Sequence, residues 1–239
     1  MMKIRGKEIN AKSLAKMIDI SYLQPYTNTK DIDDLLDICI KYDVNACCVN
    51  PNYLDHIVEK LKGTDVQPTV VIDFPFGAGT SEMKYRAAED AVKRGAVGLD
   101  LVINIGALKD GKHNVVLEDV KNCVKAGGGM DTKIIIETAY LTDEEIATAC
   151  KIVEQGGATH VKSSTGRDVG PDMKHVKIMR DSVSPSMKLK VAGTGRFWTT
   201  AVALGCIAAG VDLIGTRAGA QLVNELPLFE EIFSNIEFS

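Results

Sequence analysis

The sequence predicts an α/β fold, a (β/α)₈ barrel of the TIM type, formed by a single domain that spans residues 1–239. Three observations predict it. Short apolar segments rich in β-branched residues recur eight times, helical patterns separate them, and the chain is close to the roughly 250 residues typical of one such barrel. Eight parallel strands with this regular spacing close most economically into a barrel, which we favour over an open doubly wound sheet.

The predicted strands begin 23 to 35 residues apart, which leaves room in each unit for a strand, a short helix and two loops. The first segment is also compatible with the end of a helix. In chain order the strands are Met17 to Ser21, Val44 to Val49, Thr69 to Phe74, Gly98 to Asn104, Lys133 to Glu137, Thr159 to Ser163, Leu189 to Ala192 and Asp212 to Gly215.

Amphipathic segments with end signals lie between these strands. Thr80, Thr142 and Asp172 are side chains that favour a helix start, and Gly95, Gly156 and Gly210 favour a helix end. The predicted helices are Thr29 to Tyr42, Thr80 to Lys93, Glu118 to Lys125, Thr142 to Gln155, Asp172 to Asp181 and Thr199 to Ala209.

Composition and charge exclude several classes of protein. Hydrophobic residues make up 45% and charged residues 25% of the chain, as in ordinary globular proteins. The net charge of −4 provides no basic surface for nucleic acid or for an anionic membrane. The first residues lack the apolar core of a signal peptide, and no apolar stretch is long enough to span a membrane. We therefore expect a cytoplasmic protein.

The six cysteines show no spacing that is typical of a metal site. A zinc site would need Cys-x-x-Cys pairs or histidines near the cysteines, and the sequence around these cysteines has neither. We expect reduced thiols in apolar segments and no bound metal. Cys47 and Cys48 end a predicted strand, so one of them is expected to line the barrel mouth.

Three charged residues interrupt apolar strands. Asp100, Lys162 and Lys190 belong to the fourth, sixth and seventh predicted strands. A charge in a barrel interior is costly unless it is paired, so two lysines and one aspartate are more plausible together than any of them alone. They could equally point outward and pair with the surrounding helices, and spacing does not decide between these orientations.

Paired lysines are a device for making one amine nucleophilic. A lysine attacks a carbonyl only as the free amine, and an ordinary pKa near 10.4 leaves roughly one molecule in 2,500 deprotonated at pH 7. Burial and a second ammonium nearby lower that pKa. A carboxylate beside them can move the protons that Schiff-base formation requires.

Three glycine-rich loops with an arginine follow the last three predicted strands. Barrels commonly bind phosphate in this region, through backbone N–H groups that glycine leaves accessible. The predicted anion-binding residues in these loops are Thr165, Gly166, Arg167, Gly193, Gly195, Arg196, Gly215, Thr216 and Arg217.

From Met17 to Val223 the sequence resembles the deoxyribose-phosphate aldolase family. The resemblance rests on Phe74-Pro-Phe-Gly-Ala78, Leu99-Asp-Leu-Val-Ile-Asn-Ile-Gly-Ala-Leu108, Lys133-Ile-Ile-Ile-Glu-Thr138 and Val161-Lys-Ser-Ser-Thr-Gly166. It implies that Lys162 forms the Schiff base, that Lys190 perturbs it and that Asp100 relays protons with support from Asp19. It also implies that Cys48 belongs to the pocket, and that Arg167 takes the place of a phosphate-binding lysine.

The implied reaction is the reversible cleavage of 2-deoxy-D-ribose 5-phosphate to glyceraldehyde 3-phosphate and acetaldehyde, with no metal or organic cofactor. The resemblance also implies a homo-oligomer, a dimer or tetramer. The sequence departs from the family pattern at Gly193 to Trp198, at Thr216 to Ala218, after Asp19 and at the C-terminus. Alternatives therefore remain: an aldolase or transferase for another phosphorylated sugar, a phosphosugar isomerase, or a barrel that binds such a metabolite without catalysis.

Overall fold

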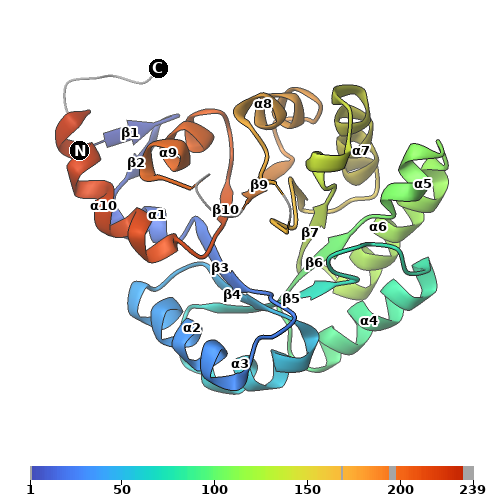
Figure 1. The fold of residues 1–239 in the computed structure, drawn as a ribbon, viewed down its shortest axis with the longest axis horizontal. Coiled ribbons are helices and arrows are strands. Elements are labelled where there is room, and N and C mark those ends of the chain that lie inside the picture. The colour runs from blue at the N-terminus through green and yellow to red at the C-terminus, as the bar shows by residue number, and fades with distance from the viewer. Residues whose placement is uncertain (1, 168, 194–197, 234–239) are drawn as a thin grey trace.

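A computed structural model describes residues 2–167, 169–193 and 198–233. Its centre is a closed barrel of parallel strands in the order β10-β3-β4-β5-β6-β7-β8-β9 (Figure 1). These strands are β3 (Ile18–Tyr22), β4 (Ala46–Val49), β5 (Gln67–Ile72), β6 (Gly98–Val102), β7 (Asp131–Ile135), β8 (His160–Lys162), β9 (Lys188–Ala192) and β10 (Leu213–Gly215). The predicted barrel is confirmed, and each predicted strand overlaps an observed one.

Helices surround the barrel on its outer side (Figure 1). The predicted helices correspond to α2 (Thr29–Tyr42), α4 (Ser81–Lys93), α6 (His113–Gly127), α7 (Asp143–Gln155), α8 (Met173–Asp181) and α9 (Thr200–Ala208). Thr80, Thr142 and Asp172 cap the helices that follow them, as predicted, because each side chain accepts a backbone N–H bond from the first turn.

The glycine signals at helix ends are confirmed at all three positions, although the three glycines differ in backbone conformation. Gly95 and Gly210 follow α4 and α9 with φ of 97° and 101°, a conformation that favours glycine. Gly156 instead ends α7 in a right-handed conformation, and its neighbour Gly157 takes the left-handed one.

Several elements were not predicted. They are the hairpin of β1 (Met2–Ile4) and β2 (Lys7–Ile9), α1 (Ala11–Ala15), α3 (Leu54–Lys60), α5 (Ile105–Lys109) and α10 (Gly219–Ile232). Most are short. The long exception, α10, contains Pro227 and follows β10 through only Thr216 to Ala218, so its sequence shows a helix breaker where the structure continues a helix.

The strands are buried on both faces, between the helices and the barrel interior, which explains why they read as continuous apolar runs. Several strands nevertheless carry a buried polar or charged side chain, among them Asp19, Asp100, Lys162 and Lys190. No helix in the described part of the chain has the length and apolar character needed to cross a membrane.

Candidate active site

The three charged strand residues all face the barrel interior. Asp100 is 0%, Lys162 4% and Lys190 1% exposed, so the alternative in which they pair with outer helices is wrong. The sheet register explains the meeting of the lysines. Lys162 on β8 is the direct partner of Lys190 on β9, and register partners on adjacent strands point to the same face.

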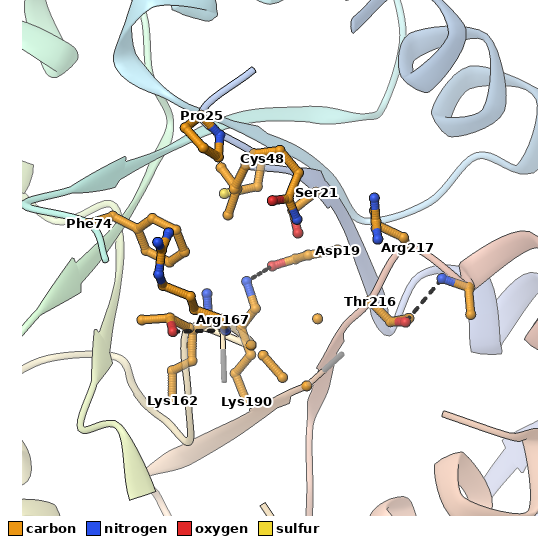
Figure 2. Close-up of a pocket in the computed structure, with 18 residues that line it drawn as sticks. Asp19, Ser21, Pro25, Cys48, Phe74, Lys162, Arg167, Lys190, Thr216 and Arg217 are labelled. Atoms are coloured by element: carbon orange, nitrogen blue, oxygen red, sulfur yellow. Dashed lines mark hydrogen bonds and ion pairs between the residues drawn. The ribbon is translucent and has the colours of Figure 1, made fainter. Parts of the chain in front are cut away.

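One carboxylate oxygen joins the two lysines. Oδ2 of Asp100 accepts a hydrogen bond from Nζ of Lys162 at 2.7 Å and from Nζ of Lys190 at 2.8 Å. Lys190 also donates to Oδ2 of Asp19 at 2.6 Å (Figure 2). Lys190 therefore contacts two carboxylates, whereas among the described residues the Lys162 ammonium forms an ion pair with Asp100 alone.

Small residues make room for this cluster. A Cβ at Gly215 on β10 would lie 3.2 Å from Cε of Lys190 and 3.0 Å from Cβ of Ala192. A larger side chain at position 215 would therefore press on the Lys190 stem. Glycine weakens a strand, and its presence at position 215 is explained by the close approach of the Lys190 side chain.

The two lysines have opposite pKa shifts. Burial lowers the pKa of Lys162, and the positive charge of Lys190 lowers it further, so that it lies below its ordinary value despite the contact with Asp100. Burial acts on Lys190 in the same direction, but the carboxylates of Asp100 and Asp19 outweigh it and raise the pKa of Lys190. Lys162 is thus the better nucleophile, and Lys190 a permanent cation.

Both aspartates are held ionised. Burial would raise the pKa of each carboxyl group, but Lys162, Lys190 and Lys133 hold the pKa of Asp100 well below its usual range. Lys190 and Lys133 likewise lower the pKa of Asp19. A carboxylate that contacts the nucleophilic amine is correctly placed to accept and return protons.

Two residues that the sequence analysis did not nominate belong to this cluster. Lys133 on β7 is fully buried, and its Nζ lies 3.6 Å from Oδ1 of Asp100. Asn45 donates a hydrogen bond from Nδ2 to Oδ1 of Asp19 at 2.6 Å, which fixes that carboxylate. Lys133 begins its predicted strand, where a lysine also suits a loop, so it did not stand out in the sequence as Lys162 does.

A cavity of ≈ 540 Å³ opens above the cluster. Its lining contains Asp19, Lys162 and Lys190 at the base, together with most of the predicted anion-binding residues. Those described there are Thr165, Gly166, Arg167, Gly193, Gly215, Thr216 and Arg217. Gly195 and Arg196 lie outside the described residues.

Arg167 and Arg217 lie on opposite sides of this cavity (Figure 2). Each guanidinium stacks on an aromatic ring, Arg167 over Phe76 at 5.6 Å and Arg217 over Tyr22 at 5.2 Å. Arg217 also directly precedes the N-terminal end of α10, where backbone N–H groups favour an anion. The mouth therefore offers two cations and a helix end to an anionic group.

Cys48 and Trp198 have different positions. Cys48 lines the cavity, as predicted, and burial raises the pKa of its thiol, so the uncharged form is favoured. Trp198 is 4% exposed, packs in the apolar core and donates its indole N–H to the carbonyl of Gly193 at 3.1 Å. It therefore holds the backbone at Gly193, and among the described residues it is not one that lines the cavity.

Comparisons with known proteins agree on one family. The model of the DeoC/LacD family aldolases matches residues 9–233. A protein of Clostridium kluyveri named deoxyribose-phosphate aldolase is 41% identical over 219 residues, which cover 91% of this chain and 100% of that protein.

Solved structures show the same likeness. An aldolase designated QR15 is 31% identical, with a TM-score of 0.84 over 94% of this chain and 99% of that one. A deoxyribose phosphate aldolase of Aeropyrum pernix, described as a unique tetramer, is 25% identical, with a TM-score of 0.83 over 92% and 93% of the two chains.

Proposed function

The chain belongs to the DeoC/LacD family of aldolases, and we propose that it catalyses the reversible cleavage of 2-deoxy-D-ribose 5-phosphate to glyceraldehyde 3-phosphate and acetaldehyde. The observation that carries this proposal is the buried contact of Lys162 and Lys190 with one oxygen of Asp100. A free amine, a fixed cation and a carboxylate at the base of one cavity are the groups that Schiff-base cleavage needs.

In this mechanism Lys162 attacks C1 of the open-chain aldehyde as the neutral amine. Its surplus proton passes to the new oxygen to give the neutral carbinolamine. A further proton, delivered from water directly or through Asp100, lets that hydroxyl leave as water and gives the iminium ion. The C2–C3 bond then breaks, its electron pair moves into the C1–C2 bond to form an enamine, and the C3 hydroxyl loses its proton as glyceraldehyde 3-phosphate leaves. Asp100 is the base within hydrogen-bond reach for these transfers, directly or through water.

The second half of the reaction returns the amine. Protonation of the enamine at C2 gives the iminium ion of acetaldehyde, and addition of water releases acetaldehyde, neutral Lys162 and the proton that dehydration took up. Asp19 takes no direct part in this scheme. Its role is to hold the Lys190 ammonium, whose charge keeps the pKa of Lys162 low throughout the cycle.

The phosphate end of the substrate lies at the mouth of the cavity in this proposal. Arg167 and Arg217 neutralise it from the two sides, and the N–H groups of the loops at Gly166, Gly193 and Gly215 to Arg217 complete the site. Cys48 contributes a neutral, apolar wall near the reacting carbon. No metal or organic cofactor takes part.

The decisive experiment is borohydride reduction of the protein in the presence of acetaldehyde, and separately of 2-deoxyribose 5-phosphate, followed by mass spectrometry of the peptides. We expect the reduced imine on the peptide that contains Lys162 from both compounds. An unmodified Lys162 peptide after both reactions, or an adduct confined to another lysine, would refute the assignment.

A second candidate is Schiff-base chemistry on a different phosphorylated sugar. The observation that favours it is Arg217, which stands where the resembling family carries serines and adds a cation to the cavity mouth. A comparison of kcat/KM across phosphorylated pentoses and hexoses would reveal it, since a better substrate than 2-deoxyribose 5-phosphate would replace our first choice.

We further propose that residues 1–239 form one catalytic domain, that the protein acts in the cytoplasm and that it assembles as a homodimer or homotetramer. The apolar side chains exposed on helices, such as Ile38 on α2 and Leu228 and Ile232 on α10, are consistent with contacts between subunits. Light scattering of the purified protein tests the assembly directly, and a monomer at micromolar concentration would contradict it.

A further inference from the structure

The loop after β5 forms one wall of the active-site cavity. Phe74 lines the cavity together with Lys162. Two residues later, the ring of Phe76 lies under the guanidinium of Arg167 at 5.6 Å, although Phe76 is itself exposed. The course of residues 73–80 therefore determines both the cavity wall and the support of an arginine at the cavity mouth.

This loop begins with a residue in an unfavourable backbone conformation. Asp73 has φ of 51°, which few residues other than glycine adopt and which persists only where the surroundings hold it. Its backbone carbonyl accepts the N–H of Gly77, and its Oδ2 accepts the N–H of Gly79, both at 2.8 Å. A Cβ at Gly77 would lie 2.0 Å from the carbonyl oxygen of Ile103, so the loop packs directly on the neighbouring backbone.

A buried ion pair outside the barrel holds the carboxylate of Asp73. Nζ of Lys84 on α4 lies 2.5 Å from Oδ2 of Asp119 on α6 and 3.6 Å from Oδ2 of Asp73. The Lys84 and Asp119 side chains are each 1% exposed. Asp119 also accepts the Ser81 hydroxyl at 2.6 Å and the Asn104 N–H at 3.2 Å. The network thus joins two helices and the loops that follow β5 and β6.

We infer that Lys84 is a positioning residue for the phosphate end of the substrate, because its ammonium orients Asp73 and thereby places Phe76 under Arg167. The inference rests on the proposed function, in which Arg167 binds the phosphate. Lys84 does not line the cavity, so it acts only through this chain of contacts. An apolar side chain could pack between the two helices as well as Lys84 does. The charge of Lys84 is therefore explained by the two carboxylates that it contacts.

The test separates binding of the phosphate from formation of the Schiff base. In Lys84→Met we expect KM for 2-deoxyribose 5-phosphate to rise about tenfold, because a small misplacement of a binding group weakens binding without changing the reacting atoms. Borohydride trapping by acetaldehyde, which has no phosphate, should keep its rate within about twofold. The matched control is Lys93→Met on the same helix, whose ammonium pairs with Glu89 at the surface.

A second variant decides the question if Lys84→Met does not fold. Asp73→Asn keeps the side-chain acceptor for Gly79 and tolerates positive φ as aspartate does, but it removes the charge that faces Lys84. We expect a rise in KM of the same kind, about threefold or more. In a Phe76→Ala background, either substitution should raise KM by less than about twofold, because the ring through which it acts is missing.

An unchanged KM in both variants, or equal losses in sugar cleavage and acetaldehyde trapping, would overturn the inference. Additive effects with Phe76→Ala would also overturn it. Failure of the proposed function looks different, because the unmodified protein would then give no adduct at Lys162 with either compound.

Discussion

Removal of the Lys190 charge should move the activity of the enzyme to higher pH. Lys162 and Lys190 contact one oxygen of Asp100 at 2.7 Å and 2.8 Å, so their nitrogens lie about 4–5 Å apart for ordinary hydrogen-bond angles. At an effective dielectric constant near 20, two positive charges at that separation repel by about 3–4 kcal/mol, which corresponds to more than about a hundredfold change in an equilibrium constant. Lys190→Met removes this repulsion.

The sign of the change follows from the nucleophile. In the proposed mechanism Lys162 acts as the deprotonated amine, and its pKa is lowered by burial and by Lys190. Without Lys190, its pKa rises, so the acidic limb of the kcat/KM profile should move upward by about 2 units or more. The freed oxygen of Asp100 then pairs with Lys162 alone, which acts in the same direction.

The assay is the pH dependence of kcat/KM for cleavage, with acetaldehyde trapping at each pH as an independent measure of the free amine. Lys188→Met is the matched control, since this lysine lies on the same strand but is exposed. Because Lys190→Met leaves Asp19 without its ion pair, the double variant with Asp19→Asn should also be measured. A folded variant whose acidic limb stays at the same pH would refute the electrostatic coupling.

Three further predictions concern the remaining parts of the site. Lys162→Ala should abolish cleavage and trapping together, and substantial activity in this variant would contradict the Schiff base. Arg217→Ser should raise KM for the phosphorylated sugar about tenfold, as expected for loss of a charge-assisted hydrogen bond of about 1.5 kcal/mol, with acetaldehyde trapping unchanged; an unchanged KM would place the phosphate elsewhere. Since the pKa values of Asp19 and Asp100 are lowered in the folded protein, they stabilise it above the ordinary aspartate pKa. The free energy of unfolding should therefore fall as the pH drops below about 4 in urea titrations, and a flat profile there would contradict the ion-pair cluster.

The barrel could be predicted because its strands are continuous apolar runs that can be recognised in the sequence alone. Strands buried on both faces must be apolar along their length, so a charge inside one, such as Asp100 or Lys162, is conspicuous in the sequence itself. The same reasoning missed Lys133 because it stands near the beginning of its strand, where a lysine also suits a loop. In the structure β7 begins at Asp131, and only the register shows that Lys133 lies opposite Asp100.

Orientation and distant contacts were beyond the sequence. Whether Lys190 points inward depends on the pairing of β9 with β8 and β10, which no local pattern specifies. Trp198 ends a segment in which the sequence departs from the family pattern. Its large apolar ring lies in the core, where its N–H also finds an acceptor, and no local pattern indicates that position. The contact between Asp73 and Lys84 joins a loop to a helix, and no residue spacing in the sequence indicates it.

The pKa values of the two lysines shift in opposite directions because Lys190 contacts one more carboxylate than Lys162 does. Both amines are buried and both contact Asp100, so burial and this contact alone do not distinguish them. Of these two lysines, Lys190 alone donates a hydrogen bond to Asp19. Asn45 fixes the Asp19 carboxylate in that position. The additional negative charge keeps Lys190 protonated, and a protonated Lys190 in turn disfavours a proton on Lys162. In the proposed mechanism, Asp19 therefore determines which amine is the nucleophile by its contact with Lys190. Exchange of Asp19 for an uncharged residue should weaken the distinction between the two amines rather than remove either one.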